Sequence, residues 1–131
     1  LDQPDYGHLL ASSFAYEGTT LNRDSFIEPF VELEPAFILG KPLGGKNTTV
    51  ADVINAVKYV VPAIEIIDSR VKNWAIGLAD TLADNGSTGA ILLGGTPRLI
   101  TELNLRDTRG VLTFNNREVI SGTRLPPLPG L

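Results

Sequence analysis

The sequence contains no cysteine and no methionine, and it has a single histidine, His8. The absence of cysteine excludes disulfide bonds and thiolate metal sites. One imidazole excludes any site that needs two, so a metal bound here would have oxygen ligands, which favours Mg²⁺, Mn²⁺ or Ca²⁺ over Zn²⁺ or Cu²⁺. One histidine without cysteine also leaves little scope for a nucleophile–histidine pair.

Charge and hydropathy disfavour two classes of partner. Eleven Lys and Arg residues against fifteen Asp and Glu residues give a net charge of −4, which argues against nucleic acid because a polyanion needs a basic surface. The longest apolar run, residues 59–67, is interrupted by Pro62 and Glu65 and is far shorter than the ~20 residues of a membrane-spanning helix. The first residues lack the blocks of a signal peptide, so we expect a cytoplasmic protein with no membrane partner.

The length of 131 residues suits one domain, and 43% hydrophobic against 20% charged residues suffices for a packed core. No internal repeat is visible. The sequence carries no initiator methionine, and we expect it to be a piece of a longer chain.

Hydrophobic patterning predicts a mixture of strands and short helices. Residues 31–34 alternate apolar and acidic side chains within an apolar segment, residues 26–39, and Pro35 indicates that this strand lies at an edge or is bulged. An apolar stripe at helical spacing and a capping box at residues 49–52 predict a helix over residues 50–61 that Pro62 ends. Other patterns predict buried strands at 63–67 and 90–93, a helix at 74–83, and a β-hairpin at 111–120 that turns on Asn115 and Asn116.

Glu32 and Glu34 form the strongest local feature. On a strand, residues i and i+2 point to the same face with Cβ atoms about 6–7 Å apart. Two carboxylates so placed repel each other unless water, a cation or a metal lies between them. The pair is therefore either the solvated face of an edge strand or part of a metal site.

Glu65 lies at the centre of an apolar run, where an unpaired carboxylate is costly or stays protonated. Arg70, five residues further on, would give it a structural ion pair. A divalent cation shared with Glu32 and Glu34 would instead make an octahedral Mg²⁺ or Mn²⁺ site completed by water or substrate oxygens. The spacing leaves both alternatives open.

Two more polar segments attract attention. Asp5 lies in an acidic turn around Pro4, and His8 follows it either as a base or as a surface residue. Asp80, Asp84, Asn85 and Ser87 follow the second predicted helix, where they either cap and turn the chain or grip an anionic substrate. No Walker motif, dinucleotide-binding glycine motif or Gly-x-Ser-x-Gly motif is present.

Five segments, taken together, resemble one family. They are residues 3–7, residues 29–34 leading into 36–43, residues 61–70, residues 80–87, and the hairpin residues 115–119. Their order and spacing resemble the hydratase/decarboxylase branch of the fumarylacetoacetate hydrolase superfamily, in particular 2-keto-4-pentenoate hydratases and 2-oxohept-4-ene-1,7-dioate hydratases. The resemblance covers roughly residues 2–122 and a central segment of the family.

The resemblance implies a Mg²⁺ or Mn²⁺ site with Glu32, Glu34 and Glu65 as ligands. It implies a substrate, a small 2-keto or 2-hydroxydienoic acid, that chelates the metal through its 2-keto or 2-enol oxygen and a carboxylate oxygen. The implied reaction is a hydro-lyase step: water adds to 2-hydroxypenta-2,4-dienoate (2-keto-4-pentenoate) to give 4-hydroxy-2-oxopentanoate in the meta-cleavage degradation of aromatic compounds.

Three further residues take roles from the same resemblance. Asp5 matches an acidic position for proton transfer or for orienting water, the work of a general acid/base. Asn85 and Ser87 match the segment that holds the substrate carboxylate and nearby water. The alternatives are a decarboxylase acting on 4-oxalocrotonate with the same ligand set, a 2-keto acid hydrolase, and a non-catalytic metal-binding fragment or scaffold.

The implied fold is α+β and mostly β. The family has a mixed sheet rolled into a barrel-like body with short flanking helices, and we expect this body to be incomplete in residues 1–122, a partial catalytic domain. Residues 123–131 are expected to form an extended Pro-rich tail. The family also assembles into homo-oligomers, and the same is expected here.

Overall fold

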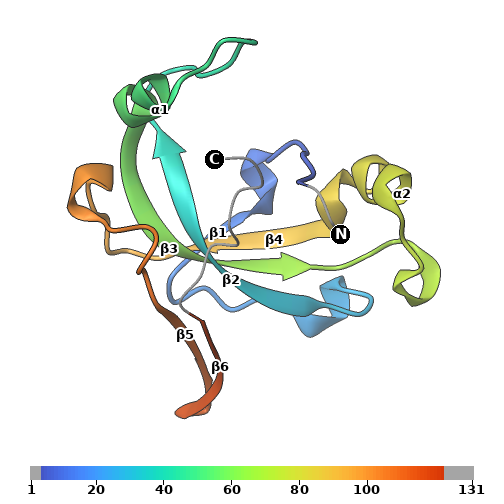
Figure 1. Ribbon diagram of the computed structural model, residues 1–131. Coiled ribbons are helices and arrows are strands. Elements are labelled where there is room, and N and C mark those ends of the chain that lie inside the picture. Colours follow the sequence, from blue (N-terminus) through green and yellow to red (C-terminus); the bar gives the residue numbers. More distant parts are fainter. Residues whose placement is uncertain (1–3, 123–131) are drawn as a thin grey trace. The chain divides into compact units, whose positions relative to one another are not determined.

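The computed structural model describes residues 4–122 (Figure 1), so the predicted Pro-rich tail, residues 123–131, lies outside the described residues. The described residues form two compact units, one from residues 4–34 with residues 62–95, and one from residues 35–61 with residues 96–122. Strands predominate and helices are short, as the α+β, mostly β prediction requires. In chain order the elements are η1 (Ala11–Ser13), β1 (Phe14–Tyr16), η2 (Arg23–Ser25), β2 (Phe30–Leu39), α1 (Val50–Ala56), β3 (Val57–Ile67), η3 (Lys72–Trp74), α2 (Leu78–Ala83), η4 (Asn85–Ser87), β4 (Thr88–Leu93), η5 (Ile100–Glu102), β5 (Gly110–Phe114) and β6 (Arg117–Gly122).

A four-stranded sheet has the strand order β1-β4-β3-β2. β1 runs parallel to β4, with Phe14 opposite Ile91. β3 runs antiparallel to β4, with Glu65 opposite the same Ile91. β2 lies at the edge, which confirms the position that Pro35 indicates, because an edge strand does not need every backbone N–H for pairing.

Small side chains let these strands pack closely. The buried apolar residues of the first unit are Ala15, Ala63, Ala90 and Ile91. At the end of β4, the Gly94 N–H donates to the Pro62 carbonyl at 2.9 Å, and a Cβ at position 94 would lie 2.8 Å from Pro62 Cγ. Glycine is therefore the residue that fits this approach of β4 to β3.

The predicted helix over residues 50–61 is wrong in its second half. The capping box is present, because the Thr49 N–H donates to Asp52 Oδ2 and the Asp52 N–H donates to Thr49 Oγ1. α1 nevertheless ends at Ala56, and β3 begins at Val57 and continues through Pro62. Residues 57–61 are β-branched or aromatic except for one lysine, and such side chains favour a strand.

The other predicted elements differ mainly in their boundaries. The strand predicted at 90–93 extends back to Thr88. The helix predicted at 74–83 is confirmed only over Leu78–Ala83. Asn73 and Trp74 adopt left-handed φ values of 58° and 52°, which an α-helix does not accommodate, so the helix cannot start at position 74. The hairpin is confirmed: β5 and β6 pair antiparallel, and Asn115 and Asn116 turn the chain with positive φ.

In the part of the chain that the structure describes, no helix is long and apolar enough to cross a membrane.

Candidate metal centre

Three carboxylates from two neighbouring strands lie together in the first unit. Glu32 and Glu34 lie on one face of β2, since they are two residues apart, and Glu65 comes from the adjacent strand β3. One carboxylate oxygen of each lies within 4.8 Å of those of the other two. The structure therefore brings the three predicted ligands to one place, with Glu32 and Glu34 exposed and Glu65 half-buried.

The cluster concentrates negative charge. Although Glu32 is an exposed residue, neighbouring atoms partly desolvate its carboxylate, which raises its pKa above the usual value, and the charge of Glu65 raises the pKa further. The pKa of Glu34 is raised in the same way, by burial first and then by Glu65 and Glu32. Glu65 itself accepts a hydrogen bond from the Thr88 hydroxyl at 2.8 Å, which fixes one of its oxygens.

Arg70 does not pair with Glu65. Its Nε lies 2.6 Å from Asp84 Oδ1, and its Nη1 donates to the carbonyl oxygens of Asp68 and Thr88. The structural ion pair that the sequence left open as an alternative is therefore wrong. Among residues 4–122, Arg70–Asp84 is the ion pair that the structure shows, so no Lys or Arg side chain there neutralises the three glutamates.

Asp84 links the end of α2 to the segment that follows β3, a role that the sequence prediction missed. Asp84 Oδ2 accepts hydrogen bonds from the Ser87 hydroxyl at 2.7 Å, the Arg70 backbone N–H at 3.2 Å and the Ser69 hydroxyl at 3.3 Å. Burial raises the pKa of Asp84, but the Ser87 hydroxyl and Arg70 outweigh burial and lower the pKa below its usual value. The spacing of Asp84 and Ser87 indicates a turn; their link to Arg70 depends on the tertiary fold.

Asp68 ties the chain ahead of β2 to the end of β3. Its carboxylate accepts the backbone N–H groups of Ile27 at 2.8 Å and Glu28 at 2.7 Å, and its own N–H donates to the Ser87 carbonyl. Asp68 is buried, so these bonds are shielded from water. They fix the start of β2, and with it the two glutamates on that strand.

Asp5 lies within electrostatic reach of the glutamates. Its charge contributes to the raised pKa of both Glu32 and Glu34, after burial and after the other glutamates. Asp5 Oδ2 accepts a hydrogen bond from the buried Thr81 hydroxyl at 3.2 Å. Three sequence-distant segments therefore supply the acidic residues here: the N-terminal segment, β2 and β3.

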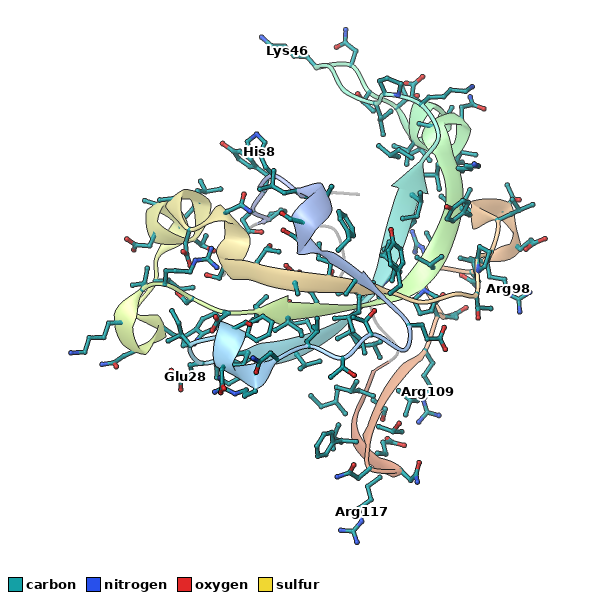
Figure 2. The ribbon with its side chains drawn as sticks, turned by 180° about the vertical axis from the view of Figure 1, so that it is seen from behind. His8, Glu28, Lys46, Arg98, Arg109 and Arg117 are labelled. Carbon is teal, nitrogen blue, oxygen red and sulfur yellow. The ribbon has the colours of Figure 1, made fainter. Side chains whose placement is uncertain are left out.

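The two predicted substrate-binding residues both bond to protein groups. The Asn85 side chain accepts from the His8 N–H at 2.7 Å and donates to the His8 carbonyl at 3.0 Å. Ser87 is buried, and its hydroxyl donates to Asp84. His8 is exposed, and its imidazole points away from the sheet (Figure 2). The substrate-binding role of Asn85 and Ser87 stays a prediction.

The donor set suits a hard divalent cation. Oxygens around a Mg²⁺ ion at about 2.1 Å stand roughly 3–4 Å apart, so oxygens within 4.8 Å of one another need only small side-chain movements to bind it. Carboxylates whose pKa is raised by mutual repulsion gain most from a bound cation. The exposure of Glu32 and Glu34 also leaves room for water or substrate oxygens.

Curated relatives match most of the chain. It is 43% identical over 122 residues to a TodF product hydratase from Pseudomonas putida F1, a match that covers 93% of this chain and 46% of the relative. It is 45% identical over 105 residues to 2-keto-4-pentenoate hydratase 1 from Dechloromonas aromatica (80% of this chain, 40% of the relative). It is 43% identical over 112 residues to an Escherichia coli 2-oxo-hept-4-ene-1,7-dioate hydratase (81% and 42%). No family model matches the sequence.

A solved structure has the same fold. A 4-oxalocrotonate decarboxylase from Pseudomonas putida G7, complexed with magnesium and adipate, superposes with a TM-score of 0.86 at 31% identity, over 94% of this chain and 47% of that chain. The chain thus spans about half the length of the proteins that it matches. These relatives confirm the resemblance that the residues indicated.

Proposed function

We infer from this homology to the 2-keto-4-pentenoate and 2-oxo-hept-4-ene-1,7-dioate hydratases that the chain supplies the metal-binding part of a hydro-lyase of the same kind. The observation that carries the proposal is the cluster of Glu32, Glu34 and Glu65, with oxygens within 4.8 Å of one another and no basic side chain among residues 4–122 to neutralise them. The proposed cofactor is Mg²⁺ or Mn²⁺.

The proposed substrate is 2-hydroxypenta-2,4-dienoate, which gains water to become 4-hydroxy-2-oxopentanoate in aromatic catabolism. A divalent cation at the three glutamates would act as a Lewis acid toward the 2-keto or 2-enol oxygen and the carboxylate of such a substrate. The three glutamates would hold the cation, and the exposure of Glu32 and Glu34 on β2 would leave its remaining positions open to substrate.

The proposed proton-transfer residue is Asp5. The Thr81 hydroxyl holds one of its oxygens and leaves the other available to a substrate or water. Ser87 and Asn85 are proposed to lie beside the substrate carboxylate, with Asn85 also bonded to the backbone of His8.

The proposal extends to architecture and assembly. Since the chain spans about half the length of its relatives, we propose that the rest of the family's domain extends the four-stranded sheet β1-β4-β3-β2 into the barrel-like body. Large apolar side chains such as Tyr6, Leu9 and Leu10 are exposed in the first unit and would be covered in such a body. Homo-oligomeric assembly and a cytoplasmic location remain predictions.

The second candidate is decarboxylation of 4-oxalocrotonate. The observation that favours it is the superposition on the magnesium-bound decarboxylase with a TM-score of 0.86. The higher identity to the hydratases, 43–45% against 31%, favours hydration.

One experiment separates the candidates. The chain is titrated with Mn²⁺ by calorimetry, and then assayed with Mn²⁺ and each dienoic or oxo-dienoic acid for hydration products and for CO2 release. Glu65→Gln should abolish Mn²⁺ binding, whereas Glu28→Gln, which removes one carboxylate outside the cluster, should preserve it. Hydration supports the first proposal, CO2 release the second, and Mn²⁺ binding without turnover supports a metal-binding scaffold. Wild-type protein that fails to bind Mn²⁺ refutes the site.

A further inference from the structure

The side chain of Asn85 joins the N-terminal segment to the turn before β4. Asn85 accepts from the His8 N–H at 2.7 Å and donates to the His8 carbonyl at 3.0 Å, so its amide pairs with both backbone groups of a residue 77 positions away. Apart from these two bonds, the Thr81–Asp5 bond is the hydrogen bond that ties residues 4–9 to the rest of the described chain. The Asn85–His8 pair is therefore the main polar anchor of the segment that carries Asp5.

The fit around this anchor is close. A Cβ at Gly7 would lie 2.7 Å from Asn85 Oδ1 and 3.2 Å from the Asn85 carbonyl oxygen. Real Cβ atoms do not approach an oxygen at 2.7 Å, so any larger residue at position 7 would push the segment away from Asn85. Glycine at position 7 and asparagine at position 85 thus form one complementary pair.

The turn that presents Asn85 is itself held in place. Asn85, Gly86 and Ser87 all have left-handed φ values, 56°, 67° and 54°, which cost conformational energy in non-glycine residues. The hydrogen bonds of Ser87 to Asp84, and of the Asp68 N–H to the Ser87 carbonyl, hold this conformation. The turn therefore gives Asn85 a fixed position from which to hold the N-terminal segment.

We propose that Asn85 is a positioning residue, which holds the Asp5-bearing segment against the Asn85–Ser87 turn and so keeps Asp5 beside the three glutamates. This inference rests on the proposed function for the identity of the site. It is additional to the proposed place of Asn85 beside the substrate carboxylate, because the amide donates one N–H to His8 and carries a second N–H. The consequence for Asp5 follows from the chain, since Asp5 precedes Gly7 by only two residues.

The test uses two variants that open the anchor from opposite sides. Asn85→Gly removes the amide and suits the left-handed backbone at position 85, so the turn is preserved. Gly7→Ala leaves the Asn85 amide intact and displaces the segment. Asn115→Gly, at a left-handed asparagine in the hairpin, is the matched control. Native folding of each variant is checked by fluorescence of the single tryptophan, Trp74.

Amide hydrogen exchange gives the first readout. We expect both Asn85→Gly and Gly7→Ala to accelerate exchange at the His8 N–H at least about tenfold, and Asn115→Gly to leave it unchanged. Unchanged exchange at His8 in Asn85→Gly would overturn the proposal. This readout needs no metal, so it decides the role of Asn85 even if the chain binds no Mn²⁺ and the proposed function fails.

Mn²⁺ affinity in a double-mutant cycle gives the second readout. Loss of the Asp5 charge in Asp5→Asn should weaken Mn²⁺ binding about 3- to 10-fold, as expected for one carboxylate near but not bound to a divalent ion. In the wild-type background, Asn85→Gly should weaken Mn²⁺ binding by a comparable factor. In the Asp5→Asn background, the same substitution should weaken Mn²⁺ binding by less than about twofold. Additive effects would show that Asn85 acts on the metal independently of Asp5 and would overturn the positioning role.

Discussion

Replacement of Glu65 by glutamine should have opposite effects on stability with and without a divalent cation. Glu65 is the leading source of repulsion on both Glu32 and Glu34. Glutamine keeps the Oε1 acceptor for the Thr88 hydroxyl and removes only the charge. The substitution therefore isolates the electrostatic contribution of one carboxylate.

The magnitude follows from the geometry of the cluster. Two unit charges at the outer limit of 4.8 Å repel by about 0.9 kcal/mol in a water-like dielectric. Glu65 takes part in two such pairs, and the exposure of Glu32 and Glu34 reduces the total by screening. We expect Glu65→Gln to raise the free energy of unfolding by about 0.5–1.5 kcal/mol in EDTA.

The effect with metal has the opposite sign. A ligand at 100 times its Kd stabilises the folded state by about 2.7 kcal/mol, and a tenfold weaker affinity reduces this to about 1.4 kcal/mol. Loss of one of three carboxylate ligands should weaken Mn²⁺ binding by at least that factor. At a Mn²⁺ concentration that saturates the wild type, the free energy of unfolding of Glu65→Gln should be lower than that of the wild type or at most equal to it.

Urea denaturation followed by Trp74 fluorescence measures both effects. Trp74 lies in the same unit, and its ring meets that of Phe30 edge-on with centroids 5.2 Å apart. Glu28→Gln is the matched control: Glu28 is exposed, and Figure 2 shows its side chain pointing outward. A Glu65→Gln variant that is less stable than wild type in EDTA, or that retains the full Mn²⁺ stabilisation, would refute the shared site.

Three further outcomes are expected. The pKa values of Glu32 and Glu34 are raised above 4.5 by burial and then by like charge, so above pH 4.5 the folded state binds more protons than the unfolded state. As the pH increases through the raised pKa values, the free energy of unfolding without metal should therefore fall, and the affinity for Mn²⁺ should rise. Urea denaturation and calorimetry that show no change with pH would contradict this. Arg70→Gln should lower the free energy of unfolding in urea by about 1–3 kcal/mol, because Asp84 stays buried without its cation, and a loss below about 0.5 kcal/mol would show that the pair contributes little. Thr49→Ala should cost about 1 kcal/mol in thermal denaturation by removing the α1 N-cap, while Thr49→Ser, which keeps the hydroxyl, should cost much less.

Local patterns predicted much of the fold and part of the site. The edge position of β2 followed from Pro35, the start of α1 from Thr49 and Asp52, and the hairpin from two adjacent asparagines. Each of these depends on interactions within a few residues. The common face of Glu32 and Glu34 could be anticipated for the same reason, because it follows from strand geometry alone, whereas the approach of Glu65 depends on β3 lying next to β2.

The missed features depend on contacts between distant residues. Spacing suggested Arg70 as a partner for Glu65, but the fold places Arg70 against Asp84, fourteen residues along the chain. The stripe at Val57, Val60 and Val61 fits both a helix face and a buried strand, and the tertiary partners of β3 decide between the two. The contact between Asn85 and His8 spans 77 residues, and no local pattern indicates it.

The Asn85–His8 contact also bears on how this protein ages. Asn85 precedes Gly86, and in an asparagine–glycine pair the following backbone nitrogen attacks the side-chain amide carbon with least hindrance. The attack releases ammonia and forms a cyclic succinimide, which water then opens to aspartate or isoaspartate. Two hydrogen bonds to His8 restrain the side-chain rotation that this attack requires. Peptide mapping of stored protein should therefore show faster deamidation at position 85 in Gly7→Ala than in wild type, and equal rates would show that the restraint is ineffective. Deamidation would make the release of the N-terminal segment irreversible, because the aspartate that replaces Asn85 has no side-chain N–H to donate to the His8 carbonyl.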